Sequence, residues 1–175
     1  MTLIGLSMMV STMASNFVKV VNGRFVRGGK PYCYVGTNFW YGPLLGMEGK
    51  EGNRQRLCKE LDAMHQLGLD NLRILVGADG DTGVEDKIAP VLQTKPGVYN
   101  DSILAGLDYL LSEMSKRKMV AVLYLTNSWE WSGGYGAYLD WAGKGPVVIP
   151  RRDGYGAYTK FANWLATNGD TLCYM

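Results

Sequence analysis

The stretch MVAVLYLTNSWEWSGG occupies residues 119–134 and gives the strongest indication of the fold class. Its first seven residues are almost wholly apolar, which is what a strand buried on both faces of a parallel sheet requires. Polar and aromatic residues follow at once, and parallel α/β sheets form their sites beyond the carboxyl ends of their strands. The stretch therefore predicts a buried strand with functional residues directly after it.

Two further strand-and-helix units surround this strand. Residues 53–67 predict a helix that Asn53 caps and Gly68 ends, and residues 72–76 predict a short buried strand. After a long loop over residues 77–100, Asn100 or Asp101 caps a second helix, and a third helix begins near Tyr155. Repeated βα units of this kind indicate a parallel sheet with right-handed crossovers.

A β-hairpin precedes these units. Residues 17–21 and 24–26 flank Asn22-Gly23, a pair that favours a tight hairpin turn. A second turn at residues 28–31 leads into a mostly apolar strand at residues 32–37. The predicted order is thus a hairpin followed by β-α-β-α-β-α.

Length and composition limit the function classes. The 175 residues suit one domain, whereas an eight-stranded α/β barrel typically needs about 250 residues. The net charge is only +2 and no Lys/Arg run is longer than three residues, which argues against nucleic acid as a partner. The single histidine, His65, excludes a multi-histidine metal site. No apolar run reaches 18 residues, so no membrane span is expected, and no motif calls for a cofactor.

The N-terminus predicts export. Residues 1–15 combine an apolar stretch with small residues and resemble a secretory signal, with cleavage near Ala14 or Ser15. The alternative is a Met-rich apolar tail. The signal would place the protein outside the cell, at the cell surface or in the periplasm. The three widely spaced cysteines are interpreted as buried thiols rather than as a disulfide framework.

Candidate site residues lie at the ends of the three predicted strands. They are polar or aromatic, in chain order Asn38, Trp40, Arg73, Asn127, Trp129 and Trp131. Aromatic rings pack against the C–H faces of sugars while amides and guanidinium groups bind hydroxyls, so the set is typical of a carbohydrate site. Each Trp could equally be core. Arg73 lies within an apolar strand and must be paired or functional.

Three other motifs favour structural interpretations. Glu130, between two tryptophans, is interpreted as hydrogen-bonded structure rather than as a catalytic carboxylate. The residues at 79–83 lack the complete ligand pattern of a calcium loop, and a solvated acidic loop is expected instead. Gly134-x-Gly136 lacks the third glycine of a dinucleotide motif. We therefore predict no metal site.

The sequence resembles glycoside hydrolase family 5, and specifically its endo-β-1,4-mannanases, from about Phe17 to Ala162. The likeness comprises GTNFWYG at 36–42, LRIL at 72–75, LQTKPGVYNDSILAGLDYLL at 92–111 and VLYLTNSWEWSGG at 122–134. The most specific part is Asn127-x-Trp129 followed by Gly133-Gly134, which matches the family's pattern after the third barrel strand. The family's second-strand arginine matches Arg73.

The resemblance implies a (β/α)8 barrel that hydrolyses β-mannan with retention through two glutamates. One is the general acid/base in an Asn-Glu pair after strand four, and the other is the nucleophile after strand seven. No Asn-Glu pair occurs here, and none of the six glutamates matches a catalytic position. The chain is therefore expected to be a truncated fragment without catalytic residues of its own, in which Arg73 and Asn127 have supporting roles.

The expected architecture is a partial (β/α)8 barrel of three to four βα units after the hairpin. A signal would occupy residues 1–15, the barrel part residues 16–162, and a divergent tail residues 163–175. The leading hypothesis is a fragment of a secreted mannanase that is inactive alone. The alternatives are a non-catalytic glycan-binding α/β module and an unrelated doubly wound domain. The expected partner is β-mannan or a related polysaccharide, and exposed barrel strands would also promote self-association.

Overall fold

The computed structural model describes residues 17–80, 87–145, 147 and 156–169. The predicted signal at residues 1–15 therefore lies outside the described residues. The chain divides into two compact units, one that ends at Val35 and one that begins at Gly36. No helix among the described residues is both long and apolar enough to span a bilayer.

The first unit is the predicted hairpin with a third short strand. Strands β1 (Lys19–Val21), β2 (Arg24–Arg27) and β3 (Lys30–Pro31) form an antiparallel sheet in that order. Asn22 and Gly23 both have positive φ, of 50° and 74°, as the tight hairpin turn requires. The turn predicted from these two residues is confirmed.

The second unit contains, apart from Val35 at the start of β4, a three-stranded sheet in the order β4-β5-β8. Its strands are β4 (Val35–Asn38), β5 (Leu69–Leu75) and β8 (Val120–Tyr124). Strands β5 and β8 are parallel, with Leu72 opposite Ala121 and Arg73 opposite Val122. The predicted parallel sheet is therefore confirmed for this pair.

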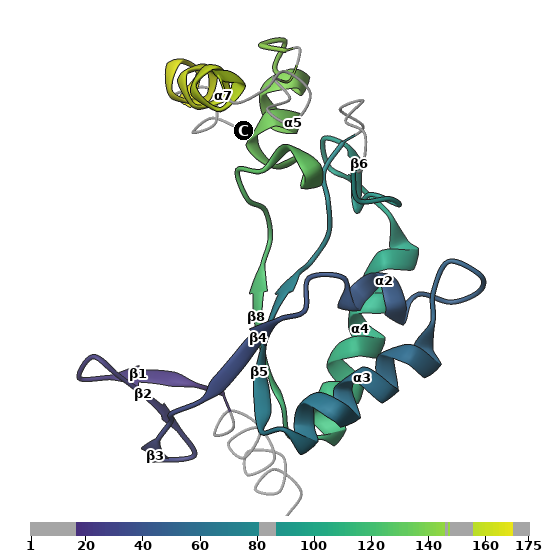
Figure 1. Ribbon diagram of the computed structural model, residues 1–175, viewed down its shortest axis with the longest axis vertical. Helices are drawn as coiled ribbons and strands as arrows, with labels where there is room; N and C mark the ends of the chain where they lie inside the picture. Colours follow the sequence, from purple (N-terminus) through teal and green to yellow (C-terminus); the bar gives the residue numbers. More distant parts are fainter. Residues whose placement is uncertain (1–16, 81–86, 146, 148–155, 170–175) are drawn as a thin grey trace, which may run out of the picture. The chain divides into compact units, whose positions relative to one another are not determined.

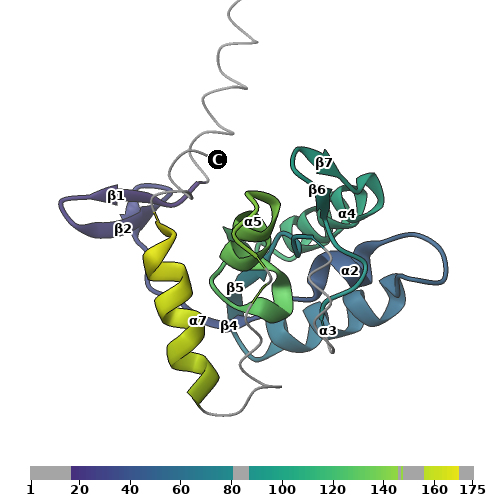
Figure 2. The same ribbon diagram turned by 90° about the horizontal axis from the view of Figure 1, so that it is seen from above.

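Three helices pack beside one face of this sheet (Figure 1, Figure 2). They are α2 (Gly42–Gly46), α3 (Arg54–Gln66) and α4 (Asp101–Lys116). The side chain of Asn53 accepts a hydrogen bond from the Arg56 N–H, and that of Asn100 accepts one from the Ser102 N–H. Each cap satisfies a backbone donor that the helix leaves unpaired. The Asn53 cap was predicted, and of the two alternatives for the second helix, Asn100 and Asp101, the cap is Asn100.

The core lies between these helices and the sheet. Its fully buried members come from every layer: Phe39, Leu57, Leu61, Leu72, Ile74, Ile103 and Leu110. Helices α2 and α4 approach each other very closely, since a Cβ on Gly46 would lie 2.1 Å from the carbonyl oxygen of Gly106. Only glycine allows this backbone contact.

Several short elements follow the strands. They are β6 (Gln93–Lys95), β7 (Val98–Tyr99), the 3₁₀ helix η1 (Glu130–Ser132), α5 (Gly134–Trp141) and α7 (Gly156–Thr167). The region 77–100, expected to be a long loop, thus contains a two-stranded hairpin. Helix α7 is the third predicted helix, whereas α5 was not predicted.

The expectation that the strand at 119–125 is buried on both faces is wrong. Val122 and Leu123 are 44% and 41% exposed, and Leu125, just past β8, is 73% exposed. Val122 and Leu123 are consecutive strand residues and so point to opposite faces of the sheet. Both are partly exposed, because no layer in the described part of the chain fully covers either face of β8.

Candidate functional site

Arg73 lies near the carboxyl end of β5, two residues before Leu75, and its side chain is exposed. Its guanidinium carbon lies 3.8 Å from the centroid of the Tyr124 ring, a cation–π arrangement. Its Nη1 also donates a 3.4 Å hydrogen bond to the Asn38 side-chain oxygen. Three neighbouring strands thus each contribute one of these residues. Within the described part of the chain, no carboxylate forms an ion pair with Arg73.

The burial of Tyr124 raises the pKa of its hydroxyl, while the positive charge of Arg73 acts in the opposite direction. The phenol therefore stays neutral at physiological pH and can donate a hydrogen bond. The guanidinium of Arg73 is a hydrogen-bond donor and has no acceptor atom. Together with the Asn38 amide, these groups can hold an oxygen-rich ligand at the carboxyl ends of the strands.

Asn127 shapes the loop that follows β8. Its side-chain oxygen accepts hydrogen bonds from the Trp129 N–H and from the Ser132 hydroxyl, both at 2.8 Å. Because that oxygen is used within the loop, only the side-chain NH₂ group remains for a ligand. The indole of Trp129 is 48% exposed. Asn127 therefore stabilises the loop conformation in which the Trp129 indole is exposed.

The two other candidate tryptophans contact each other. Trp40 and Trp131 pack edge to face with ring centroids 5.9 Å apart. Trp131 is half-buried and packs against a small cluster of Leu75, Ala78 and Ile88, while Trp40 is 39% exposed. Trp129 and Trp40 thus offer aromatic surface, whereas much of Trp131 is used for packing. Whether these residues bind sugar stays a prediction.

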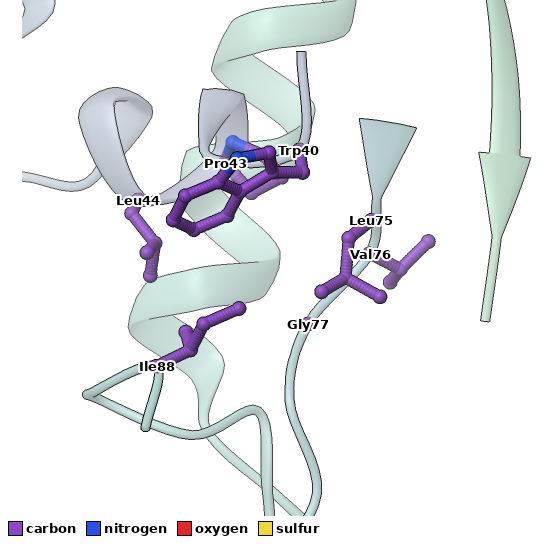
Figure 3. A pocket seen from close by; sticks show the side chains of 7 residues that line it. All are labelled: Trp40, Pro43, Leu44, Leu75, Val76, Gly77 and Ile88. Atoms are coloured by element: carbon purple, nitrogen blue, oxygen red, sulfur yellow. The ribbon is translucent and has the colours of Figure 1, made fainter. Parts of the chain in front are cut away.

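Trp40 also covers a very small cavity (Figure 3). Its indole lines the cavity together with Pro43, with Leu44 on one side, Leu75 on the other and Ile88 below in this view. The enclosed volume is about 10 Å³, which is room for a single water molecule at most. This cavity cannot hold a sugar ring, so any contact of Trp40 with a ligand must use its exposed side.

Asp79 departs from the expected solvated acidic loop. The residue is only 4% exposed, and burial raises the pKa of its carboxyl group. Its side chain accepts hydrogen bonds from Gln93 and Tyr138 at one oxygen and from Thr126 at the other. The prediction is therefore wrong for Asp79, because partners from distant segments surround it. Asp81 lies outside the described residues.

A larger groove opens beside this carboxyl group. Its volume is about 350 Å³, and apolar and polar residues line it in equal number: Val76, Leu92, Leu104 and Leu125, with Asp79, Gln93, Tyr99 and Tyr138. Sequence analysis missed Gln93 and Tyr138. Only the LQTKPG segment within the family resemblance drew attention to that region. Among the described residues, no group of three or more His, Cys, Asp and Glu could hold a metal ion.

Glu130 is almost completely buried, at 1% exposure. Its Oε2 atom has no hydrogen-bond partner among the described residues, so the expected hydrogen-bonded role is not seen for that oxygen. The next residues explain the tight packing of the loop. A Cβ on Gly133 would lie 1.8 Å from the Asp79 carbonyl oxygen, and one on Gly134 would lie 2.1 Å from that of Asn127. The Gly-Gly pair thus lets backbone pack directly on backbone.

Comparison with known families identifies the chain. Residues 15–172 match the model of the "GH family 5 beta-mannosidase-like" family. The chain belongs to glycoside hydrolase family 5. The expected resemblance is confirmed, and the parallel α/β arrangement is the partial (β/α)8 barrel that was predicted.

Solved structures and curated relatives agree with this family assignment. The crystal structure of a family 5 mannosidase from Rhizomucor miehei is 34% identical, with a TM-score of 0.81 over 91% of this chain and 40% of that one. Mannan endo-1,4-beta-mannosidase 1 from rice is 32% identical over 126 residues, which is 72% of this chain and 27% of the relative. Mannan endo-1,4-beta-mannosidase 5 from tomato is 27% identical over 87% of this chain and 33% of its own. The chain thus spans about a third of its curated relatives' length.

Proposed function

We propose that this chain forms the N-terminal part of a family 5 barrel that acts on β-mannosidic bonds in mannan-type polysaccharides. The names of the plant relatives support this substrate class. A mutant of the Rhizomucor miehei mannosidase, whose wild type matches this chain at 34% identity, was solved in complex with mannosyl-fructose. The chemistry proposed is glycoside hydrolysis with retention.

The observation that carries the proposal is the position of the Arg73 guanidinium and the groups that contact it. A guanidinium at the carboxyl ends of parallel strands, held by Asn38 and Tyr124 and paired with no described carboxylate, is suited to an incoming acidic or hydroxylated group. The family resemblance implies that this arginine orients the nucleophilic glutamate and lowers its pKa. Trp129 and Trp40 would provide the aromatic surface for sugar rings.

We further propose that residues 1–175 bind mannan-type sugar but do not hydrolyse it. None of the chain's glutamates matches a catalytic position of the family: Glu48, Glu51, Glu60, Glu85, Glu113 and Glu130. Among those described, Glu113 is ion-paired with Arg117, and Glu60 accepts hydrogen bonds from Tyr41 and Arg56. Both are committed to the helical layer. Loss of paired catalytic groups commonly costs several orders of magnitude in rate.

The test combines turnover with binding. Purified chain is incubated with mannohexaose, and released reducing ends are compared with a mock preparation. Binding is measured by calorimetry with the wild type, with Trp129→Leu and with Trp164→Leu as the matched control in α7. We expect binding without turnover, and weaker binding only for Trp129→Leu. Turnover above the mock, or no binding by the wild type, would contradict the proposal.

We also propose that the protein is exported, since residues 1–15 resemble a secretory signal. The test is expression in a secreting host followed by mass spectrometry of the mature N-terminus. Cleavage near Ala14 or Ser15, with protein in the medium, is the expected result. An intact Met1 on protein retained in the cell would contradict it.

A further inference from the structure

The carboxyl group of Asp79 connects four segments that are distant in the sequence. Asp79 itself follows β5. Gln93 in β6 donates from Nε2 to Oδ1 of Asp79 at 3.2 Å, and the Tyr138 hydroxyl of α5 lies 3.5 Å from the same oxygen. The Thr126 hydroxyl, just past β8, donates to Oδ2 at 3.2 Å. We call these four residues the Asp79 cluster.

Gln93 forms further hydrogen bonds within and beside the cluster. Nε2 of Gln93 also lies 3.0 Å from the hydroxyl of Tyr138, and Oε1 of Gln93 accepts a hydrogen bond from the Gly97 N–H. Asp79 and Gln93 are both at least nine-tenths buried. Hydrogen bonds to a buried carboxyl group are strong, and leaving any of them unmade is costly.

Asp79 contacts the loop at residues 126–134 near both of its ends. At its start, Thr126 binds the Asp79 carboxyl group and directly precedes Asn127, which braces Trp129. Near its end, the Asp79 N–H donates to the Ser132 carbonyl oxygen at 2.9 Å, and Gly133 packs against the Asp79 carbonyl. Asp79 therefore contacts both ends of the loop that carries the exposed indole ring of Trp129.

We propose that Asp79 is a positioning residue that fixes the loop at residues 126–134 and so sets the orientation of Trp129 toward sugar. The effect on affinity rests on the proposed function, while the effect on the loop does not. A carboxylate is required because both of its oxygens accept hydrogen bonds from different segments. Asparagine offers only one such acceptor. The groove beside the cluster gives the loop space to move when a bond is lost.

The experiment follows Trp129 directly. The full chain is labelled with 5-fluorotryptophan, and the ¹⁹F resonance of Trp129 among the five tryptophans is assigned with Trp129→Phe. Two variants test the cluster: Asp79→Asn and the milder, nearly isosteric Thr126→Val. The matched control is Thr94→Val, which removes a hydroxyl bonded within the β6–β7 hairpin, outside the cluster.

Both cluster variants should shift or broaden the Trp129 resonance and leave that of Trp164 unchanged. They should also weaken mannohexaose binding about three- to tenfold, the factor that one net hydrogen bond corresponds to. The control should change neither quantity. If Asp79→Asn does not fold, Thr126→Val decides the outcome alone.

The outcomes separate the two proposals. A Trp129 resonance that moves while the wild type binds no sugar supports the positioning role and contradicts the proposed function. An unchanged Trp129 resonance in folded variants overturns the positioning role, whatever the affinity. Equal changes at all five tryptophans also overturn it, since they indicate a general loss of packing rather than a local one.

Discussion

Strands β5 and β8 lie side by side and parallel, and both are rich in apolar residues, yet their burial differs. In β5, Leu72 and Ile74 are fully buried under the helices. In β8, Leu123, which is opposite Ile74, is 41% exposed. The difference shows that neighbours, rather than a strand's own sequence, determine its burial. An apolar strand needs other side chains packed against it, and these must come from elsewhere in the chain or from a partner.

The two strands also differ in the number of strands beside them. β5 has a strand on each side, whereas β8 is at the edge of the described sheet. In a closed barrel there is no edge, and the inner face of every strand is packed. The sequence of β8 fits that central environment. We therefore expect mutations to be costly in and around β5 and mild in β8.

The largest expected effect is truncation in the covered strand. Leu72→Ala should lower the free energy of unfolding by about 2–5 kcal/mol, because it leaves a cavity at a site that cannot collapse easily. The same change in the edge strand, Leu123→Ala, should cost less than about 1 kcal/mol, since less apolar area is lost. Urea denaturation measures both. Equal losses would break the contrast between the strands.

The second prediction concerns the helical layer over β5. Glu113 in α4 pairs with Lys116 and, at 2.9 Å, with Arg117, whose Nε also bonds Asp62 of α3 at 2.7 Å. The bonds to Lys116 and Arg117 hold the pKa of Glu113 below its usual value. Glu113→Gln should therefore cost about 1–3 kcal/mol at neutral pH, as loss of charged hydrogen bonds does.

The pH dependence provides the control for this prediction. A carboxyl group with a lowered folded pKa stabilises the protein above its unfolded pKa of about 4.5, and this contribution is lost as pH falls through the folded pKa. The gap in unfolding free energy between wild type and Glu113→Gln should shrink below pH 4.5. A gap that stays constant down to pH 3 would show that the ion pairs do not cause it.

Local signals in the sequence predicted much of this fold. The caps Asn53 and Asn100 and the Asn22-Gly23 turn act through neighbouring backbone groups, so a few residues suffice to recognise them. Helix α5 was missed because its sequence, GYGAYLDW, has glycines that disfavour helix in isolation. The β6–β7 hairpin was missed because its strands are only three and two residues long.

The candidate site was predictable only in part. Arg73 was chosen as a candidate because a charge in an apolar strand is exceptional, and its contacts with Asn38 and Tyr124 follow from the neighbouring strands. Asp79 was misjudged because its partners are 14 to 59 positions away in the sequence. No local pattern indicates such burial. Long-range hydrogen bonds are visible only once the segments are placed together.

The third prediction tests the contact that joins the two strands. Arg73→Gln removes the guanidinium from the Tyr124 ring, and exposed cation–π pairs contribute about 0.5–1 kcal/mol. Unfolding free energy should fall by no more than this, while binding of mannohexaose should weaken. Arg24→Gln, an exposed site on β2, controls for the change in charge. A loss of stability well above 1 kcal/mol would mean that Arg73 mainly serves the fold.

The smallest expected effect on stability, but a clear effect on association, comes from a charge on the edge strand. An unpaired apolar edge is a template for pairing with another chain, and lysine on such an edge prevents this. Leu123→Lys should change the unfolding free energy by less than about 0.5 kcal/mol, as is usual at exposed positions. It should also shift the chain from associated species to monomer in light scattering after gel filtration. Leu67→Lys is the matched control, because Leu67 is 76% exposed at the end of α3 and belongs to no strand. A wild type that is already monomeric, or equal shifts for both variants, would show that the β8 edge does not drive association.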